Sequence, residues 1–309
     1  MRIREYLANL DGVTAELYAL PEIYACPSWG EMSAGFRRHA AEAVKLMFLE
    51  KEIFFFAALQ WCFAAAGAAA WAVAAGVAAG AGSADPRVGL LTGFILPLFL
   101  LVLFSAAAAF PVWLLTGCMG AAHFLHKQGK ESTVLGCLRI VLPKARTLLE
   151  FHWINIRYGL RYDFDKGGGR RNYREKEVNR DLHEAWKLGA AGILPALLTG
   201  RSLLDAGRRS VGFLKAKAVD VIIVKAVYQL FCKATIGLVC AGLLLFFTAG
   251  RGAPGRAAVL QGVLALVAAG AAVLMLLRPV YIISLCGIYS DYITEKGEGI
   301  VLPEPPAAA

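Results

Sequence analysis

Four long stretches without a charged side chain constrain this chain more than any other feature. Residues 53–84, 88–122 and 257–277 contain no Asp, Glu, Lys or Arg, and residues 234–250 form a shorter run of the same kind. A helix that crosses a bilayer needs about 20 mostly apolar residues. Three runs meet this length. The fourth meets it if the helix includes Lys233 near its end, where a lysine can reach the interface.

These runs predict an all-α membrane protein with four transmembrane helices. We place the spans at about residues 53–81, 88–118, 226–249 and 257–288. The alternative is a set of buried core helices in a soluble protein, but such helices are commonly shorter. The composition favours the membrane, because 58% of the residues are hydrophobic and only 18% are charged. No charged side chain is expected deep inside a span.

The distribution of basic residues predicts the orientation. The short loops at residues 85–87 and 251–256 hold only three arginines, whereas residues 119–220 hold 19 Lys or Arg against 10 Asp or Glu. Positively charged loops stay in the cytoplasm. We therefore expect a multi-pass protein of the inner (cytoplasmic) membrane with both termini and the middle segment inside. The first 34 residues lack a signal-peptide pattern, so the first span is expected to act as the insertion signal.

An internal repeat is indicated by the stretches "PVWLLTGC" and "PVYIISLC". They begin at Pro111 and Pro279, 168 residues apart, and the same offset relates Gly129 to Gly297. Chance matches are common in apolar sequence, but here one offset aligns a proline, a cysteine and a glycine. Each unit would hold two spans and insert the same way up, which predicts two parallel-repeat hairpins. The two prolines are expected to kink their helices and to face other helices.

A basic amphipathic helix precedes the hairpin of each unit. Residues 34–52 and 205–225 place apolar and basic side chains on opposite faces, which is typical of helices at a membrane surface. Ser202 and Asp205 predict the start of the second helix. The predicted division of the chain is as follows: an N-terminal cytoplasmic segment 1–33, repeat unit 1 at 34–130, a basic cytoplasmic or interfacial segment 131–201, repeat unit 2 at 202–298 and a disordered tail 299–309.

The middle segment contains two stretches whose relation to the membrane is left open. Residues 131–162, which include the stretch 147–162, carry charges too often for a span, and an amphipathic pair of helices broken before Pro143 is expected there. Residues 185–200 are apolar but short and contain Pro195, which favours an interfacial turn. If both stretches crossed the membrane, the protein would have six spans. If only one did, the second unit would be inverted.

Basic side chains are the candidate lipid-binding residues. Two pairs lie on the interfacial helices and a third pair follows a glycine-rich loop: Arg37 and Arg38, Arg208 and Arg209, Arg170 and Arg171. Such clusters attract anionic headgroups. We expect membrane lipids, most of all anionic ones, as partners, together with a protein partner or a second copy of the chain. Nucleic acid is not expected, because cytoplasmic loops account for the excess of basic residues.

Histidines supply the remaining candidate chemistry. His123 and His126 are three residues apart and share a helix face, so they are weak candidates for a metal. No third ligand is placed by the sequence, and no metal or other cofactor is expected. His39 and Glu42 resemble half of a carboxylate-bridged site. A membrane enzyme would require His39, Glu42, His123 and His126 to converge, and no catalytic residue is assigned.

The order of these features resembles an uncharacterised prokaryotic integral-membrane family, a domain of unknown function. The resemblance lies in "RRHAAEAVKLMFLEKEIFFF", in "GAAHFLHKQGKESTVLGCLRIVLPKARTLLEFHW" and in "AWKLGAAGILPALLTGRSLLDAGRRSVGFLKAK". The matching positions are Arg37, Arg38, Gly129, Trp186, Pro195, Arg208, Arg209 and Ser210. Members of the family have a more apolar middle segment, whereas this chain has His152, Asn155 and Arg157 there. The resemblance implies an architecture and brings no activity.

The sequence favours a non-enzymatic membrane module that organises anionic lipids or assembles with partners. The alternative is a small transporter or permease component with its site at the interface of the two repeats and with the two prolines as flexible points. A membrane enzyme comes third. A polar cavity between the repeats would favour the transporter, and a packed apolar seam would favour the module.

Overall fold

In the computed structural model, the residues that the structure describes are 28–80, 95–154, 191–200, 202–249, 269–270, 273–300 and 302. The regular structure in these ranges is entirely helical. It comprises α2 (Trp29–Leu49), α3 (Lys51–Gly80), α5 (Leu96–Lys127), α6 (Val134–Val141), the 3₁₀ helix η3 (Leu142–Lys144), helices over residues 145–154 and 191–199, α9 (Leu203–Ala249), the π-helix η4 (Val273–Leu277) and α11 (Arg278–Glu295).

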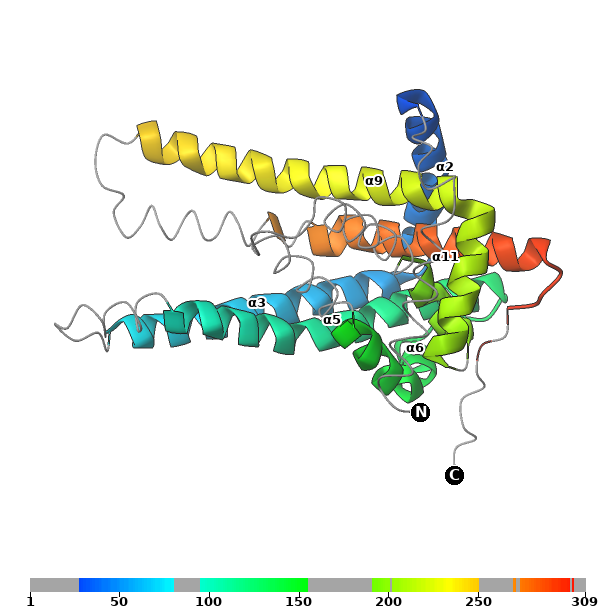
Figure 1. The fold of residues 1–309 in the computed structure, drawn as a ribbon, viewed down its shortest axis with the longest axis horizontal. Coiled ribbons are helices and arrows are strands. Elements are labelled where there is room, and N and C mark those ends of the chain that lie inside the picture. The colour runs from blue at the N-terminus through cyan, green and yellow to red at the C-terminus, as the bar shows by residue number, and fades with distance from the viewer. Residues whose placement is uncertain are drawn as a thin grey trace, which may run out of the picture.

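Helices α3, α5 and α11 and the longer part of α9 lie along one direction of the molecule (Figure 1). Helices α3 and α5 pack against each other and run in opposite directions. Helix α11 packs against α5 on one side and against α9 on the other, so it joins the two halves of the chain. The core lies where α5, α11 and the helix over residues 191–199 meet.

Two helical stretches are long and apolar enough to cross a membrane, Lys51–Trp71 in α3 and Asp205–Val239 in α9. The first overlaps the predicted span at 53–81. The second begins earlier than the predicted span at 226–249. The predicted spans at 88–118 and 257–288 fall partly on residues outside the described ranges.

The helices expected at the membrane surface run across the long segments. Figure 1 shows α2 crossing the direction of α9 and α11, and it shows the first part of α9 turned away from the rest of that helix. The turn occurs at Lys217, whose φ of −129° and ψ of 27° are not helical. The Lys217 Nζ lies 2.7 Å from Glu295 Oε1 at the end of α11, so this ion pair ties the corner of α9 to its neighbour.

Side-chain caps explain where both surface helices begin. Ser28 and Glu31 form a capping box at α2, which therefore starts earlier than the predicted residue 34. At α9 the Asp205 N–H donates to Ser202 Oγ at 3.2 Å, which confirms the predicted cap. Each cap provides an acceptor for an N–H group that has no partner inside the helix.

In the middle segment, the predicted break at Pro143 is confirmed. Helix α6 ends at Val141, η3 contains the proline, and a second helix covers residues 145–154. The helix over residues 191–199 contains Pro195 and is buried over almost its whole length. At about 1.5 Å per residue it is too short to cross a bilayer. The parts of the two open stretches that fall within 155–190 lie outside the described residues.

The chain adopts the same turn at the end of α5 and at the end of α11, two positions that are related by the offset of 168 residues. Gly129 after α5 has a φ of 68°, and Gly297 after α11 has a φ of 71°. The N–H groups of Lys130 and Glu298 donate to the carbonyls of Leu125 and Ile293, at 3.0 and 3.1 Å. This is the hydrogen bond of the Schellman motif, in which a left-handed glycine ends the helix.

The two prolines of the repeat differ in their setting. Pro111 lies inside α5 as predicted. Pro279 instead lies in the first turn of α11, as its second residue, directly after the π-helix η4. The N–H groups in the first turn of an α-helix have no acceptor inside that helix, so a proline at this position removes no hydrogen bond from it.

Candidate functional site

The first arginine pair is held by contacts within the protein. The Arg37 Nε donates to the Ser33 carbonyl at 3.2 Å. One terminal nitrogen of Arg38 lies 3.3 Å from Asp220 Oδ1 on α9. Both arginines are exposed, but Arg38 has a carboxylate partner that links α2 to α9. An exposed pair of this kind contributes about 0.2–1 kcal/mol to stability.

The second arginine pair lines an open cleft of about 640 Å³, the arginine cleft. Its residues come from the end of the 191–199 helix, from the first turns of α9 and from the chain after α11: Thr199, Gly200, Asp205, Arg208, Arg209, Ile293, Glu298 and Gly299. Asp205 is engaged by the Ser202 hydroxyl at 2.8 Å. The structure therefore places Arg208 and Arg209 in one cleft. It separates them from Arg38, whose partner Asp220 lies beyond the bend at Lys217. Arg170 and Arg171 lie outside the described residues.

Four residues that the sequence left as candidates line a second cleft, of about 290 Å³, the histidine cleft. His39 and Glu42 come from α2, and His123 and His126 come from the end of α5. The rest of the lining comes from the same two helices and from α11: Ala43, Lys45, Leu46, Leu49, Lys127, Ile283, Ser284 and Gly287. These four side chains, whose convergence a membrane enzyme would require, thus line one cleft.

Two of the three histidines have carboxylate partners. The His39 Nε2 lies 3.5 Å from Asp220 Oδ1, and the His126 Nδ1 lies 2.7 Å from Glu50 Oε1. Glu50 also accepts a hydrogen bond from the Ser132 hydroxyl. These contacts engage one nitrogen of each ring, and the Nε2 of His39 also lies 3.2 Å from a terminal nitrogen of Arg38.

His123 differs from the other two. Only 4% of the residue is exposed, and neither ring nitrogen has a hydrogen-bond partner. Burial lowers the pKa of His123 to about 3, and the charges of Lys127 and His126 act in the same direction. The ring is therefore neutral near pH 7, with one nitrogen as a donor and the other as an acceptor.

Among the described residues, no three His, Cys, Asp or Glu side chains are arranged to hold a metal ion. His123 and His126 line one cleft, but the third ligand that a zinc site requires is not supplied by this part of the chain. Three of the cysteines, Cys118, Cys137 and Cys286, are free and buried. Burial raises the pKa of the Cys137 thiol to about 12, so this thiol stays protonated near neutral pH.

Arg278 is a candidate that sequence reasoning missed. No charge was expected deep inside the predicted span at 257–288. Arg278 nevertheless lies within this span, directly after the charge-free run at 257–277. The structure places its guanidinium 5.8 Å from the centre of the Trp113 ring. Tyr228 and Tyr281, which stack with their ring centres 4.4 Å apart, interact electrostatically with the same side chain. A cation in such aromatic surroundings is stabilised by the ring faces.

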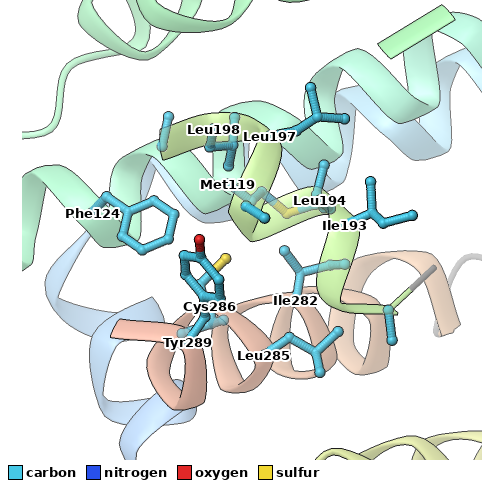
Figure 2. Close-up of a cluster of buried hydrophobic side chains, with 14 of the residues drawn as sticks. Met119, Phe124, Ile193, Leu194, Leu197, Leu198, Ile282, Leu285, Cys286 and Tyr289 are labelled. Atoms are coloured by element: carbon cyan, nitrogen blue, oxygen red, sulfur yellow. The ribbon is translucent and has the colours of Figure 1, made fainter. Parts of the chain in front are cut away.

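The seam between the two halves is packed with apolar side chains. Gly120 of α5 lies so close to its neighbours that an added Cβ would be 2.6 Å from Leu198 Cδ1 and 3.2 Å from Cys286 Sγ. Figure 2 shows this region, where three segments contribute buried side chains: Met119, Phe124, Ile193, Leu194, Leu197, Leu198, Ile282, Leu285, Cys286 and Tyr289. Helices approach closely where the residues at their contact are small.

Comparison of the chain with protein families, with curated proteins and with solved structures found no match.

Proposed function

We propose that this protein is an integral membrane protein of four spans, built from two parallel hairpin repeats, and that it acts as a non-enzymatic module that gathers anionic lipids at its cytoplasmic face. Its membrane location is supported by the two apolar helical stretches in α3 and α9. The repeat is supported by the equal turns at Gly129 and Gly297.

The observation that carries the lipid proposal is the position of Arg208 and Arg209 in the arginine cleft. They lie on the part of α9 that turns across the long helices, where an interfacial helix would meet headgroups. A guanidinium binds a phosphate through two parallel hydrogen bonds, and two adjacent arginines increase the local positive potential.

The packed seam favours this module over a transporter. A carrier with cargo between the repeats needs a polar or hydrated space there. Around Gly120 the α5–α11 contact is instead filled by apolar side chains and small residues, and the polar histidine cleft lies farther along, where α2 joins these two helices. Assembly with a protein partner or with a second copy is compatible with the same architecture.

The test is native mass spectrometry of the protein released from nanodiscs that contain phosphatidylglycerol and phosphatidylcholine. We expect Arg208→Gln with Arg209→Gln to lose retained phosphatidylglycerol. Arg37→Gln with Arg38→Gln should lose less, because Arg38 is already paired with Asp220. Arg139→Gln, an exposed residue of α6 outside both clefts, is the matched control. Equal retention in all variants would refute the arginine cleft as a lipid site.

Arg278 supports a second candidate, a transporter for small anions. It lies on α11 next to Pro279 and contacts Trp113, two residues after Pro111, so it joins the two repeats at their prolines. A charged side chain inside a span is a functional hypothesis by default. Swelling of proteoliposomes in potassium glutamate or potassium phosphate should then be faster than in protein-free vesicles and should slow in Arg278→Gln. Equal swelling of vesicles with and without protein would rule this candidate out.

A further inference from the structure

The histidine cleft contains an unsatisfied polar group that packing alone does not explain. A buried polar atom without a hydrogen bond is destabilising, and nearly all such atoms in folded proteins have partners. Both ring nitrogens of His123 lack one, although the ring is almost fully buried and lines the cleft. A ligand that both donates and accepts a hydrogen bond, such as a hydroxyl group, would satisfy this side chain.

The charged residues that line the cleft indicate the sign of that ligand. Lys45 and Lys127 line it, and Glu42 is the one carboxylate among the lining residues. Lys45 is exposed and has no ion-pair partner in the described part of the chain. Lys127 lies 4.0 Å from Asp291, a separation at the limit of an ion pair. The basic side chains in the lining outnumber the acidic one, so the cleft favours an anion.

Carboxylates fix the other two histidines of the cleft in position. Asp220 contacts His39 and Glu50 contacts His126, each at one ring nitrogen. The cleft therefore adds imidazole rings from α2 and from α5 to the lysine ammonium groups as polar lining.

The apolar part of the lining indicates that the ligand has a hydrocarbon portion. Leu46, Leu49 and Ile283 line the cleft beside the polar groups. Leu49 is 59% exposed, and its neighbour Phe48 is 72% exposed, so an apolar surface continues from the cleft along α2. Exposed apolar side chains on a surface helix are expected to contact acyl chains.

From these observations we infer that the histidine cleft is a specific binding site for a single phospholipid whose headgroup carries a phosphate and free hydroxyl groups. The phosphate lies between Lys45 and Lys127, a headgroup hydroxyl pairs with His123, and the acyl chains follow Leu49 and Phe48. The inference rests on the membrane location proposed above. It does not depend on the arginine cleft, which shares no lining residue with the histidine cleft.

The test measures retention of phosphatidylglycerol, which has both the phosphate and the hydroxyl groups, by native mass spectrometry of the full chain. Phosphatidylcholine, which has no free hydroxyl and no net charge, is the comparison lipid. We expect one phosphatidylglycerol per chain to be retained in preference to phosphatidylcholine. The variant Lys45→Gln should weaken binding about fivefold, the effect of one basic residue near an anionic surface. His123→Leu should weaken it roughly three- to tenfold through the lost hydrogen bonds.

Lys215→Gln is the matched control, because it removes the same charge from an exposed position of α9 outside both clefts. Lys45 is exposed and unpaired, so Lys45→Gln gives a clear result even if His123→Leu does not fold. Equal retention of both lipids, or retention that is indifferent to Lys45 and His123, would overturn the site. If millimolar glycerol phosphate displaces the lipid, the cleft binds a soluble phosphate ester rather than a phospholipid, and the inference is overturned.

The design separates this inference from the proposed function. Loss of lipid in the Lys45 and His123 variants, without loss in the Arg208 and Arg209 variants, would support the histidine cleft and refute the arginine cleft. The reverse result would refute the histidine cleft and leave the arginine cleft supported.

Discussion

The seam between α5 and α11 can be tested with a single methyl group. Gly120 and Gly287 both lie in helices at this contact, but they differ in the space around them. A Cβ at Gly120 would come within 2.6 Å of Leu198 Cδ1 and 3.2 Å of Cys286 Sγ. A Cβ at Gly287 would meet only His123 Cε1, at 3.8 Å, which is an ordinary contact. Leu198 and Cys286 are each 0% exposed, so neither has free space into which to move.

Two effects determine how much each substitution changes the free energy of unfolding. Replacing glycine by alanine inside a helix stabilises it by about 1 kcal/mol, and this gain applies to both positions. Overpacking a filled core costs about 1–3 kcal/mol, and this cost applies to Gly120→Ala alone. The two variants should therefore differ by about 1–3 kcal/mol in free energy of unfolding, with Gly287→Ala the more stable.

Thermal unfolding in detergent measures this difference. A maleimide dye that becomes fluorescent on reaction with thiols reports unfolding through the buried Cys118, Cys137 and Cys286. At about 2–4 °C per kcal/mol, a 2 kcal/mol difference lowers the unfolding temperature of Gly120→Ala by about 4–8 °C relative to Gly287→Ala. An unfolding temperature for Gly120→Ala equal to or above that of Gly287→Ala would show that the seam has space to spare. The packing argument against a transporter would then fail.

Two further predictions concern the turns and a buried lysine. Gly297→Ala should destabilise the protein by about 1–2 kcal/mol, the cost of a left-handed non-glycine residue. No atom within 4 Å would meet its Cβ, so a result equal to that of the control Gly299→Ala in the same thermal assay would contradict the assigned turn. The Lys144 Nζ donates to the carbonyls of Leu197, Leu198 and Gly200 at 2.7, 2.5 and 3.0 Å, and burial lowers its pKa to about 8. Because an unfolded lysine titrates at about 10.4, the unfolded chain binds more protons between these values and stability should rise with pH there. The wild-type unfolding temperature should rise over this window relative to that of Lys144→Met, and parallel curves would argue against this reasoning.

Several local features could be predicted because their causes lie within a few residues along the chain. The cap at Ser202 and Asp205 needs only a side chain and an N–H three residues later. The break at Pro143 needs only a ring that cannot continue an α-helix. The positive φ at Gly129 and Gly297 follows from a residue type that adopts it without a steric cost. Predicting these features requires no knowledge of which other segments pack against them.

The prediction was less complete where a neighbour from another part of the chain determines the structure. The bend at Lys217 is bridged to Glu295, 78 residues away, so a continuous helical pattern does not reveal it. Arg278 lies beside Trp113 and two tyrosines, whereas in the sequence it simply ends an apolar run. The lining of the histidine cleft comes from α2, α5 and α11, and no spacing in the sequence shows that these three helices meet at one cleft.

The sequence by itself determined that the described chain is helical and that long apolar segments alternate with basic ones, because helical periodicity and the spacing of charges depend on residues within a few turns of one another. The tertiary structure decided which side chains have partners. Arg38 lies against Asp220, Arg208 and Arg209 line an open cleft, and His123 is buried with none. The reason is that hydrogen bonds and ion pairs form over about 3 Å, and only the packing of distant helices brings groups within that distance.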